Sequence, residues 1–387
     1  MKSRPLMTIF AIVFIDLVGF GIVIPLLPLY AERYHPSPLQ FGLLLSSFSA
    51  MQFLFAPVLG RLSDRFGRKP VLLVSLAGSV VGYVLFAFAG SLAALFAARI
   101  IDGISGGNIS TAQAYVADVT RPEDRAKGMG VVGAAFGLGF ILGPAIAGVT
   151  VVWGAAAPGL AAAAMSACAL LATLVFLREP EHAGPARQER RGILRIVRDR
   201  RILLVLTVFF LLTFAFSNFE ATFSQFLHDR MGAAPSAVAF FFVYIGVLIS
   251  LVQGGAIRPL SRLLGERPLA VGGILLVALG LFLLPLAGTR GRLALVLIPL
   301  TLGIGAANPS LSSFVSRLSG RGERGAVLGA YQSMSSLGRI LGPLWGEFAY
   351  FRLGPAGPQW SGALVAASAG ALALWAVSPG ARAREGA

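Results

Sequence analysis

The sequence predicts an all-α integral membrane protein with twelve transmembrane helices, arranged as two parallel six-helix repeats around a central cavity. The first observation behind this is composition: 56% of the 387 residues are hydrophobic, 13% are charged, and the mean hydropathy is +0.79. Soluble domains are about a quarter charged and less than half apolar. A water-soluble globule is therefore excluded. The other two observations are basic residues concentrated in the loops on one side of the membrane, and an internal sequence repeat.

Twelve stretches are long and apolar enough to be spans, since a helix needs about 20 mainly apolar residues to cross the bilayer. The first is too long for the apolar region of a signal peptide, contains Asp16 and lacks a cleavage site, so we expect it to remain as a helix. The predicted spans are 6–30, 39–60, 70–89, 91–117, 127–150, 156–177, 202–227, 236–257, 268–288, 293–316, 325–350 and 359–378.

The basic residues favour one side of the membrane. With a cytoplasmic N-terminus, 25 of the 32 Lys and Arg lie in cytoplasmic segments and 5 lie on the opposite side, while Arg99 and Arg339 fall inside spans. This is the positive-inside pattern, and it predicts a multi-pass protein of a cell membrane, a bacterial inner membrane, with both termini cytoplasmic. The net charge of +15 is spread over separate loops, which argues against nucleic acid as a partner.

The chain divides into two similar halves. A polar stretch at 178–201 predicts a cytoplasmic linker between an N-terminal six-helix bundle, 1–177, and a C-terminal six-helix bundle, 202–387. A shift of 199 residues places the sequence ILGP at 141–144 on ILGP at 340–343, and a shift of 198 places Pro70 on Pro268. Parallel repeats of six spans are a transporter architecture.

Signatures of other functions are missing from the sequence. It has one cysteine, Cys168, three histidines without ligand spacing, and no phosphate-binding loop, nucleophile elbow or zinc-protease motif. We therefore predict no enzyme activity, no cofactor and no metal. The expected partners are a small-molecule substrate, protons and the lipid bilayer, with the chain acting as a monomer.

The most specific motif is GRLSDRFGRKP at 60–70. It resembles the loop signature of the major facilitator superfamily, whose fold matches the predicted spans, linker and repeat. The resemblance implies a charge network that latches the outward-open state, with Asp118 as the acid from span four; the alternative is a basic turn that only sets topology. In the second half, Arg262 and Glu266 replace Asp64 and Arg68, which gives an inverted or weakened latch. The predicted latch residues are Gly60, Asp64, Arg65, Gly67, Arg68 and Asp118.

Span five contains two glycine pairs with four-residue spacing, Gly133 with Gly137 and Gly139 with Gly143, and Pro144 follows directly. Such spacing permits close helix packing, and it is similar to the antiporter motif of the family, which implies export. Residues 16–28 and Gln52 resemble the twelve-span drug:proton antiporters, most closely the tetracycline exporters. Those exporters have an acid where this chain has Gly82, and another in span nine, where 268–288 has none. Both differences argue against tetracycline as substrate.

Ionisable residues inside spans are functional candidates because an unpaired charge in the bilayer is costly. Asp16 and Glu220 are the predicted proton carriers, since a carboxyl removed from water can titrate near neutral pH. Arg99 and Asp102 either neutralise each other or line the cavity. Arg339 either pairs with Glu220 or Asp16, or binds an anionic substrate. Glu347 is expected to be a solvated residue near the interface.

Uncharged polar side chains complete the predicted cavity, each equally suited to helix–helix hydrogen bonding. The predicted function is proton-coupled efflux of small lipophilic or drug-like molecules. The alternatives are a symporter or facilitator for a polar solute or organic anion, and a non-transporting sensor or lipid-handling protein. The predicted cavity residues are Gln52, Arg99, Asp102, Asn108, Gln113, Asn218, Tyr244, Asn308 and Arg339.

Overall fold

The computed structural model describes residues 3–120, 135, 138–139, 142–180, 199–318 and 324–376. Every regular element in these ranges is helical, which confirms the all-α class. Eight of the described helices are long and apolar enough to cross a membrane, or nine if the bent pair of α1 and α2 counts as one span. The remaining predicted stretches coincide with the shorter helix Leu142–Trp153 and with two long helices near the C-terminus.

The chain forms two compact units, Met1–Arg187 with Ala221–Val247, and Gln188–Glu220 with Leu248–Ala387. Two of the changes from one unit to the other fall inside helices, between Glu220 and Ala221 in Arg200–Met231 and between Val247 and Leu248 in Pro235–Leu251. The division into bundles 1–177 and 202–387 stays a prediction.

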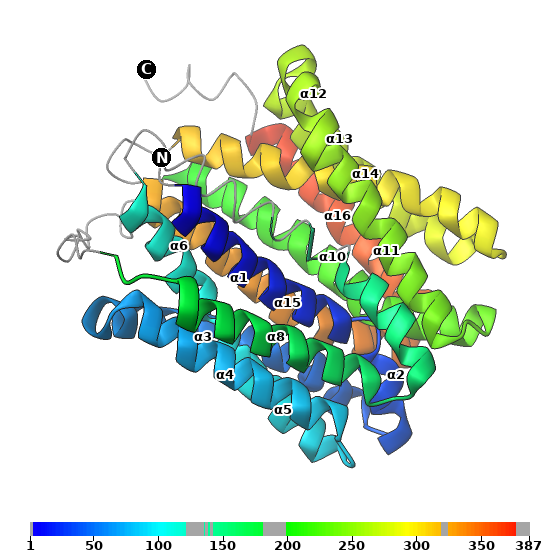
Figure 1. Cartoon of the computed structure of the whole chain (residues 1–387). Helices are drawn as coiled ribbons and strands as arrows, with labels where there is room; N and C mark the ends of the chain where they lie inside the picture. Colours follow the sequence, from blue (N-terminus) through cyan, green and yellow to red (C-terminus); the bar gives the residue numbers. More distant parts are fainter. Residues whose placement is uncertain are drawn as a thin grey trace, which may run out of the picture. The chain divides into compact units, whose positions relative to one another are not determined.

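The first unit is built from the N-terminal helices, coloured blue to green in Figure 1. Pro25 lies between α1 and α2 and has no N–H to continue the helix, and the two helical parts are bent by 48°. The predicted single stretch 6–30 is therefore a broken helix. The elements are α1 Ser3–Val23, α2 Leu27–Ala31, the short turn Glu32–Tyr34, α3 Pro38–Phe66, α4 Arg68–Ala87, α5 Leu92–Gly106, α6 Asn108–Val119 and α8 Ala157–Phe176.

Small residues bring the helices of the first unit together. Helix α4 packs against both α5 and α8, and the three lie side by side with α3. A Cβ added at Gly82 would lie 3.1 Å from the Asp102 Cβ, and one at Gly159 would lie 2.8 Å from the Ala87 Cα. Close backbone approach through glycine and alanine is typical of helix packing in lipid, where contacts replace the hydrophobic effect.

The second unit contains the C-terminal helices. The predicted span 236–257 is not a uniform helix, because it passes through a π-helical turn, Val252–Ala256, that includes two glycines. Helix α13 packs against α14 and α16, and a Cβ added at Gly303 would lie 2.5 Å from the Gly273 carbonyl oxygen. The helices are α10 Arg200–Met231 and α11 Pro235–Leu251, which both units share, then α12 Ile257–Leu264, α13 Glu266–Leu283, α14 Arg290–Leu318, α15 Arg324–Leu353 and α16 Gly357–Ala376.

Candidate functional site

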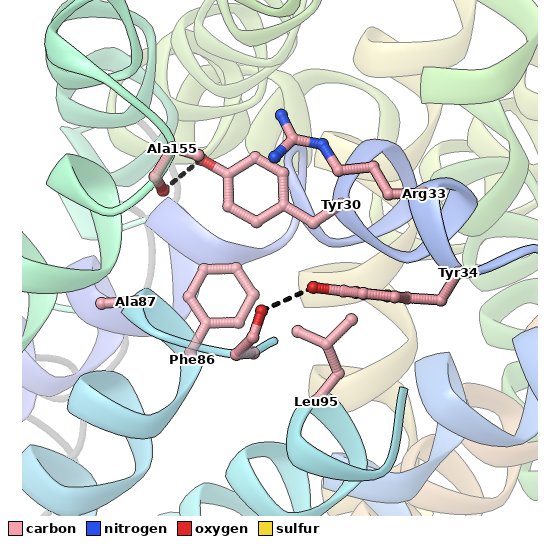
Figure 2. A pocket seen from close by; sticks show the side chains of 8 residues that line it. Tyr30, Arg33, Tyr34, Phe86, Ala87, Leu95 and Ala155 are labelled. Carbon is pink, nitrogen blue, oxygen red and sulfur yellow. Dashed lines mark hydrogen bonds between the residues drawn. The ribbon is translucent and has the colours of Figure 1, made fainter. Parts of the chain in front are cut away.

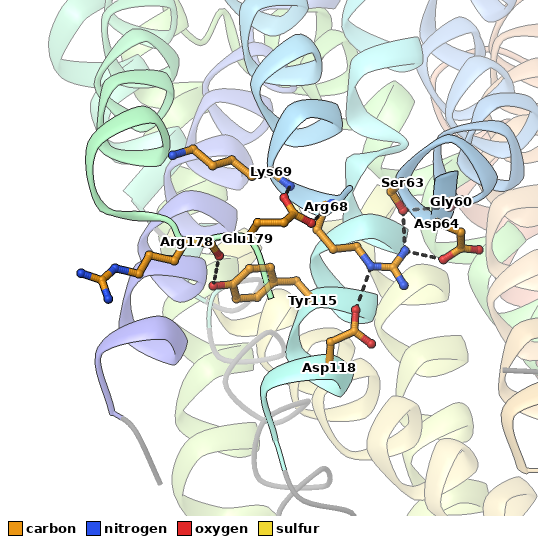
Figure 3. Close-up of polar contacts among 9 residues, drawn as sticks. All are labelled: Gly60, Ser63, Asp64, Arg68, Lys69, Tyr115, Asp118, Arg178 and Glu179. Atoms are coloured by element: carbon orange, nitrogen blue, oxygen red, sulfur yellow. Dashed lines mark hydrogen bonds and ion pairs between the residues drawn. The ribbon is translucent and has the colours of Figure 1, made fainter. Parts of the chain in front are cut away.

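Arg68 is the centre of a polar network between the end of α3, the start of α4 and the end of α6, which we name the Arg68 cluster (Figure 3). The Arg68 Nη1 lies 2.6 Å from both the Asp64 Oδ1 and the Ser63 Oγ, and its Nε donates to the Asp118 Oδ2 at 2.9 Å. The Arg68 side chain is 12% exposed. The structure thus brings together three charged residues of the predicted latch: Asp64, Arg68 and Asp118.

The other predicted latch residues contribute differently. Gly67 has φ of 101°, a conformation that side chains rarely adopt, and it ends α3 and begins α4. Gly60 lies inside α3, and an added Cβ would approach no atom closer than the Ser110 Oγ at 3.8 Å. Gly60 therefore makes no unusually close contact with a neighbouring helix. Arg65 is exposed, with its guanidinium over the ring of Phe66.

Asp16 is buried in the middle of the first unit, where two neutral side chains bind it. The Asn108 Nδ2 donates to the Asp16 Oδ2 at 3.2 Å, and the Ser79 Oγ lies 3.4 Å from the Asp16 Oδ1. The Asp16 side chain is on α1, Ser79 on α4 and Asn108 on α6. Because both partners are neutral, the Asp16 carboxyl can gain or lose a proton without leaving the positive charge of a partner side chain unpaired.

Arg99 and Asp102 pair with each other on α5, at 3.1 Å and almost fully buried. The Arg99 guanidinium also lies 4.6 Å from the ring centroid of Phe48 and 5.8 Å from that of Phe20. One carboxylate and two aromatic faces thus compensate the charge of the buried arginine, although its Nε has no hydrogen-bond partner among the described residues. The structure therefore favours the interpretation in which these two charges neutralise each other.

The uncharged cavity candidates are mostly engaged in helix–helix contacts. Gln52 donates to the Gly106 carbonyl at 2.9 Å, which joins α3 to α5, and Asn218 donates to the Pro358 carbonyl at 2.7 Å, which joins α10 to α16. Gln113 is exposed on α6. Tyr244 lies on α11 and Asn308 on α14.

In the second unit, Glu220 on α10 and Arg339 on α15 interact electrostatically, and each is half-buried. This agrees with one of the two expected roles of Arg339. Glu347, predicted to be solvated, is instead only 4% exposed. Its place on the long helix α15, packed against α14 and α16, explains the difference.

The second half contains an ion pair with reversed charge. Glu266, at the start of α13, accepts from the Arg317 Nη2 at 2.8 Å and from the Ser313 Oγ at 2.6 Å, both on α14. Under the repeat shifts, Glu266 corresponds to Arg68 and Arg317 to Asp118. In each half, an ion pair therefore joins the corresponding helices. The acid and the base have exchanged places in the second half, so the pair is inverted and not missing.

Helix Leu142–Trp153 packs closely against α1. A Cβ at Gly143 would lie 2.6 Å from the backbone of Gly21 and 2.8 Å from the Val18 carbonyl oxygen, and one at Gly139 would lie 2.7 Å from the Leu17 Cβ. Pro144 is in the same helix. Gly133 and Gly137, the first glycines of the predicted antiporter motif, lie outside the described residues.

We expect Gly143→Ala to destabilise the protein, because its methyl group would force α1 and its neighbour apart. Overpacking of this kind costs about 1–3 kcal/mol, and thermal unfolding in detergent should show a lower midpoint. Gly272→Ala, on α13 with no atom within 4 Å of the added Cβ, is the matched control and should leave the midpoint unchanged or raise it. Equal midpoints for both variants would contradict the close contact.

A small pocket of about 40 Å³ lies among loops of the first unit and contains none of the predicted site residues. Figure 2 shows two tyrosine hydroxyls in it, both donating to backbone carbonyls: Tyr30 to Ala155 at 2.7 Å, and Tyr34 to Ala89 at 2.6 Å. The guanidinium of Arg33 lies over the Tyr30 ring. The two hydroxyls therefore link the segment from α2 to Tyr34 with the loop after α4 and with the turn before α8.

The sequence interpretation missed Glu179 and Arg317. Glu179 stood in the predicted linker, yet its carboxylate accepts from the backbone N–H groups of Arg68 and Lys69. No local pattern marks such a contact, since 111 residues separate Glu179 from Arg68. Arg317 could have been found, because the repeat shift that aligns span five also places it on Asp118.

Comparison with known proteins agrees with this architecture. The model of the Major Facilitator Superfamily matches residues 9–343. The chain is 35% identical to the class C tetracycline resistance protein of Escherichia coli over 89% of each chain, and 32% identical to the major facilitator superfamily domain-containing protein 10 of Bos taurus over 91% of this chain and 88% of that one.

Among solved structures, the human organic anion transporter MFSD10 (TETRAN) is 28% identical and superposes with a TM-score of 0.73, over 96% of this chain and 99% of that one. A bacterial homologue of the human lysosomal transporter Spinster has a TM-score of 0.81 at 14% identity over 97% of each chain, which shows the fold alone. This chain therefore belongs to the major facilitator superfamily and is a multi-pass membrane transporter rather than an enzyme.

Proposed function

We propose that the protein exports small lipophilic or drug-like molecules in exchange for protons, by alternating access of a cavity between two six-helix bundles. The observation that carries this proposal is Asp16, a buried carboxyl in α1 whose two hydrogen-bond partners are neutral. Such a group can bind a proton or a cationic substrate, but not both at once. Asp102, in contrast, is paired with Arg99 and is the weaker candidate for proton carrier.

The similarity to tetracycline resistance proteins supports export of drug-like compounds. Gly143, which packs closely against α1, belongs to the glycine pattern that is similar to the family's antiporter motif, and this supports export as well. Gly82, in close contact with Asp102, stands where the tetracycline exporters have an acid. We therefore propose a substrate other than tetracycline. The non-transporting alternative is not favoured, because the relatives are transporters.

We further propose a monomer in a bacterial inner membrane with both termini cytoplasmic. The distribution of 25 basic residues on one side and 5 on the other supports this orientation. The Arg68 cluster then lies at the cytoplasmic end of the first bundle and serves as the conformational latch, while the segment 178–201 links the bundles.

The direction of coupling can be tested in everted membrane vesicles with an acidic lumen, monitored with a pH-sensitive acridine dye. Tetracycline, ethidium and fluorescein serve as probes of a neutral polar drug, a lipophilic cation and an organic anion. For an exporter, addition of a substrate should release protons from the lumen and restore dye fluorescence. Substrate movement in the same direction as protons would refute antiport, and response to fluorescein alone would favour the organic-anion alternative.

We expect Glu220→Gln to abolish the fluorescence response, because glutamine cannot carry a proton and the charge of Arg339 loses its partner. The double variant Glu220→Gln/Arg339→Gln separates the two causes. If Glu220 carries protons, the double variant stays inactive; if Glu220 only compensates Arg339, activity returns. Equal amounts of each variant in the membrane are confirmed by immunoblotting.

A further inference from the structure

The start of α4 is an unfavourable place for positive charge. Each helix has a partial positive charge at its N-terminus, and this one begins with Arg68, Lys69 and Pro70 and has no acid in its first turn. The corresponding helix of the second unit, α13, begins with Glu266 and supplies its own acid. Helix α4 therefore needs a negative charge from elsewhere in the chain.

Glu179 supplies that charge. Its Oε1 accepts from the Arg68 N–H at 2.5 Å and its Oε2 from the Lys69 N–H at 2.8 Å (Figure 3). Pro70 has no N–H, and the Gly67 N–H bonds the Ser63 carbonyl at 3.2 Å. The two bonds to Glu179 thus complete the hydrogen bonding of the first helical positions, which have no partners within the helix.

Residues at and just after the end of α8 bind two of the three helices that carry the Arg68 cluster, α4 and α6. The Tyr115 hydroxyl, on α6 with Asp118, donates to the Arg178 carbonyl at 3.0 Å. In return, the Lys69 Nζ donates to the Leu174 carbonyl at 2.8 Å, near the negative end of α8. The segment 174–179 therefore fixes α4 and α6 at the level where Arg68 meets Asp118.

The conformation of Gly67 fits the same arrangement. A Cβ at this position would lie 2.9 Å from the carboxylate of Glu179, and the φ of 101° already disfavours a side chain. The glycine between α3 and α4 thus leaves room for the carboxylate to reach the helix start. The absence of a side chain at Gly67 and the position of the Glu179 carboxylate therefore belong to the same arrangement.

From these contacts we infer that Glu179 is a positioning residue of the transporter: its carboxylate holds the first turn of α4 so that Arg68 reaches Asp64 and Asp118. The inference rests on the proposed role of the Arg68 cluster as the conformational latch. Movement of the segment after α8 would release two backbone bonds of α4 and so loosen Arg68. Glu179 thereby couples the start of the inter-bundle segment to the latch.

Two measurements on the full-length protein in lipid nanodiscs and proteoliposomes test this. Hydrogen exchange of the peptide spanning 67–72 reports on the two amides, and the initial rate of substrate-driven proton release reports on transport. In Glu179→Ala we expect about tenfold faster amide exchange, from loss of charge-assisted bonds, and a several-fold lower maximal rate at unchanged apparent KM. Glu179→Asp should recover part of both.

Arg178→Ala is the matched control, because only the backbone carbonyl of Arg178 takes part and its side chain points away from the cluster (Figure 3). This variant should exchange and transport like the parent. Unchanged amide exchange in Glu179→Ala would overturn the inference, and so would faster exchange at a parental transport rate. The exchange measurement needs no substrate, so it tests the contacts of Glu179 with the two amides independently of transport. Absence of proton-coupled transport in the parent protein would refute the proposed function.

Discussion

Replacement of Asp16 by asparagine is expected to reduce proton-driven transport to the level of vesicles that lack the protein. Asparagine has nearly the same shape, and its carbonyl oxygen can still accept from Asn108, so the surrounding helices should keep their packing. It cannot, however, take up or release a proton. The measurement is substrate-driven proton release in everted vesicles, with the amount of protein in the membrane determined in parallel.

Downhill exchange of labelled substrate distinguishes loss of coupling from loss of folding. With an uncharged substrate, the Asp16→Asn variant should retain this exchange if alternating access is intact, because neither a proton nor a cation has to bind at position 16. Asp199→Asn makes the same chemical change at an exposed position before α10, where the side-chain oxygen can still accept from the Arg201 N–H, and it should behave like the parent. Proton release at the parental rate in Asp16→Asn would exclude Asp16 as the carrier.

A second large effect is expected from Arg68→Lys, although the charge is conserved. The guanidinium donates through Nε to Asp118 and through Nη1 to Asp64 and Ser63, and a lysine ammonium cannot reproduce this forked geometry. The Asp64 side chain is 59% exposed, so its pair with Arg68 contributes about 1 kcal/mol or less. The Asp118 side chain is 21% exposed, and its contact accounts for most of the expected loss.

We expect the transport rate of Arg68→Lys to fall about tenfold, which corresponds to about 1.4 kcal/mol in a conformational barrier. Initial rates in proteoliposomes at saturating substrate provide the measurement. Arg65→Lys, three residues earlier and exposed, is the control and should leave the rate within twofold of the parent. If both variants transport equally well, the Arg68 cluster only sets topology, as the alternative interpretation of the motif holds.

The fold was accessible from the sequence because each of its determinants is a local or periodic signal. Apolar stretches of helical length gave the class and the approximate element positions. Breaks within the spans were not predicted. Pro25 was visible in the first stretch, but whether a proline bends a helix or ends it depends on the neighbours that satisfy the freed carbonyl groups. The π-helical turn at Val252–Ala256 contains two adjacent glycines, but a glycine pair alone does not decide whether a helix continues, bends or ends.

The site residues that could be predicted are those that belong to a sequence motif, or that are charged and lie inside a span, where an unpaired charge is costly. Arg68, Asp64 and Asp118 meet as expected, and Asp16 lies among polar side chains. The contact of Glu179 with α4 was not predictable, because it depends on how α8 packs beside α4. Likewise, the sequence left open whether Arg99 pairs with Asp102 or lines a cavity, and the positions of Asp102 and Phe48 favour the pairing.

The inverted pair of the second half has a consequence for how the duplicated halves fold. Arg68 would meet a like charge if it approached Arg317, and Glu266 would meet one at Asp118. A helix that docked onto the counterpart of its partner helix in the other repeat would therefore be repelled, whereas the correct partner attracts it. We therefore expect the opposite polarity to favour pairing within each repeat over pairing between the two repeats.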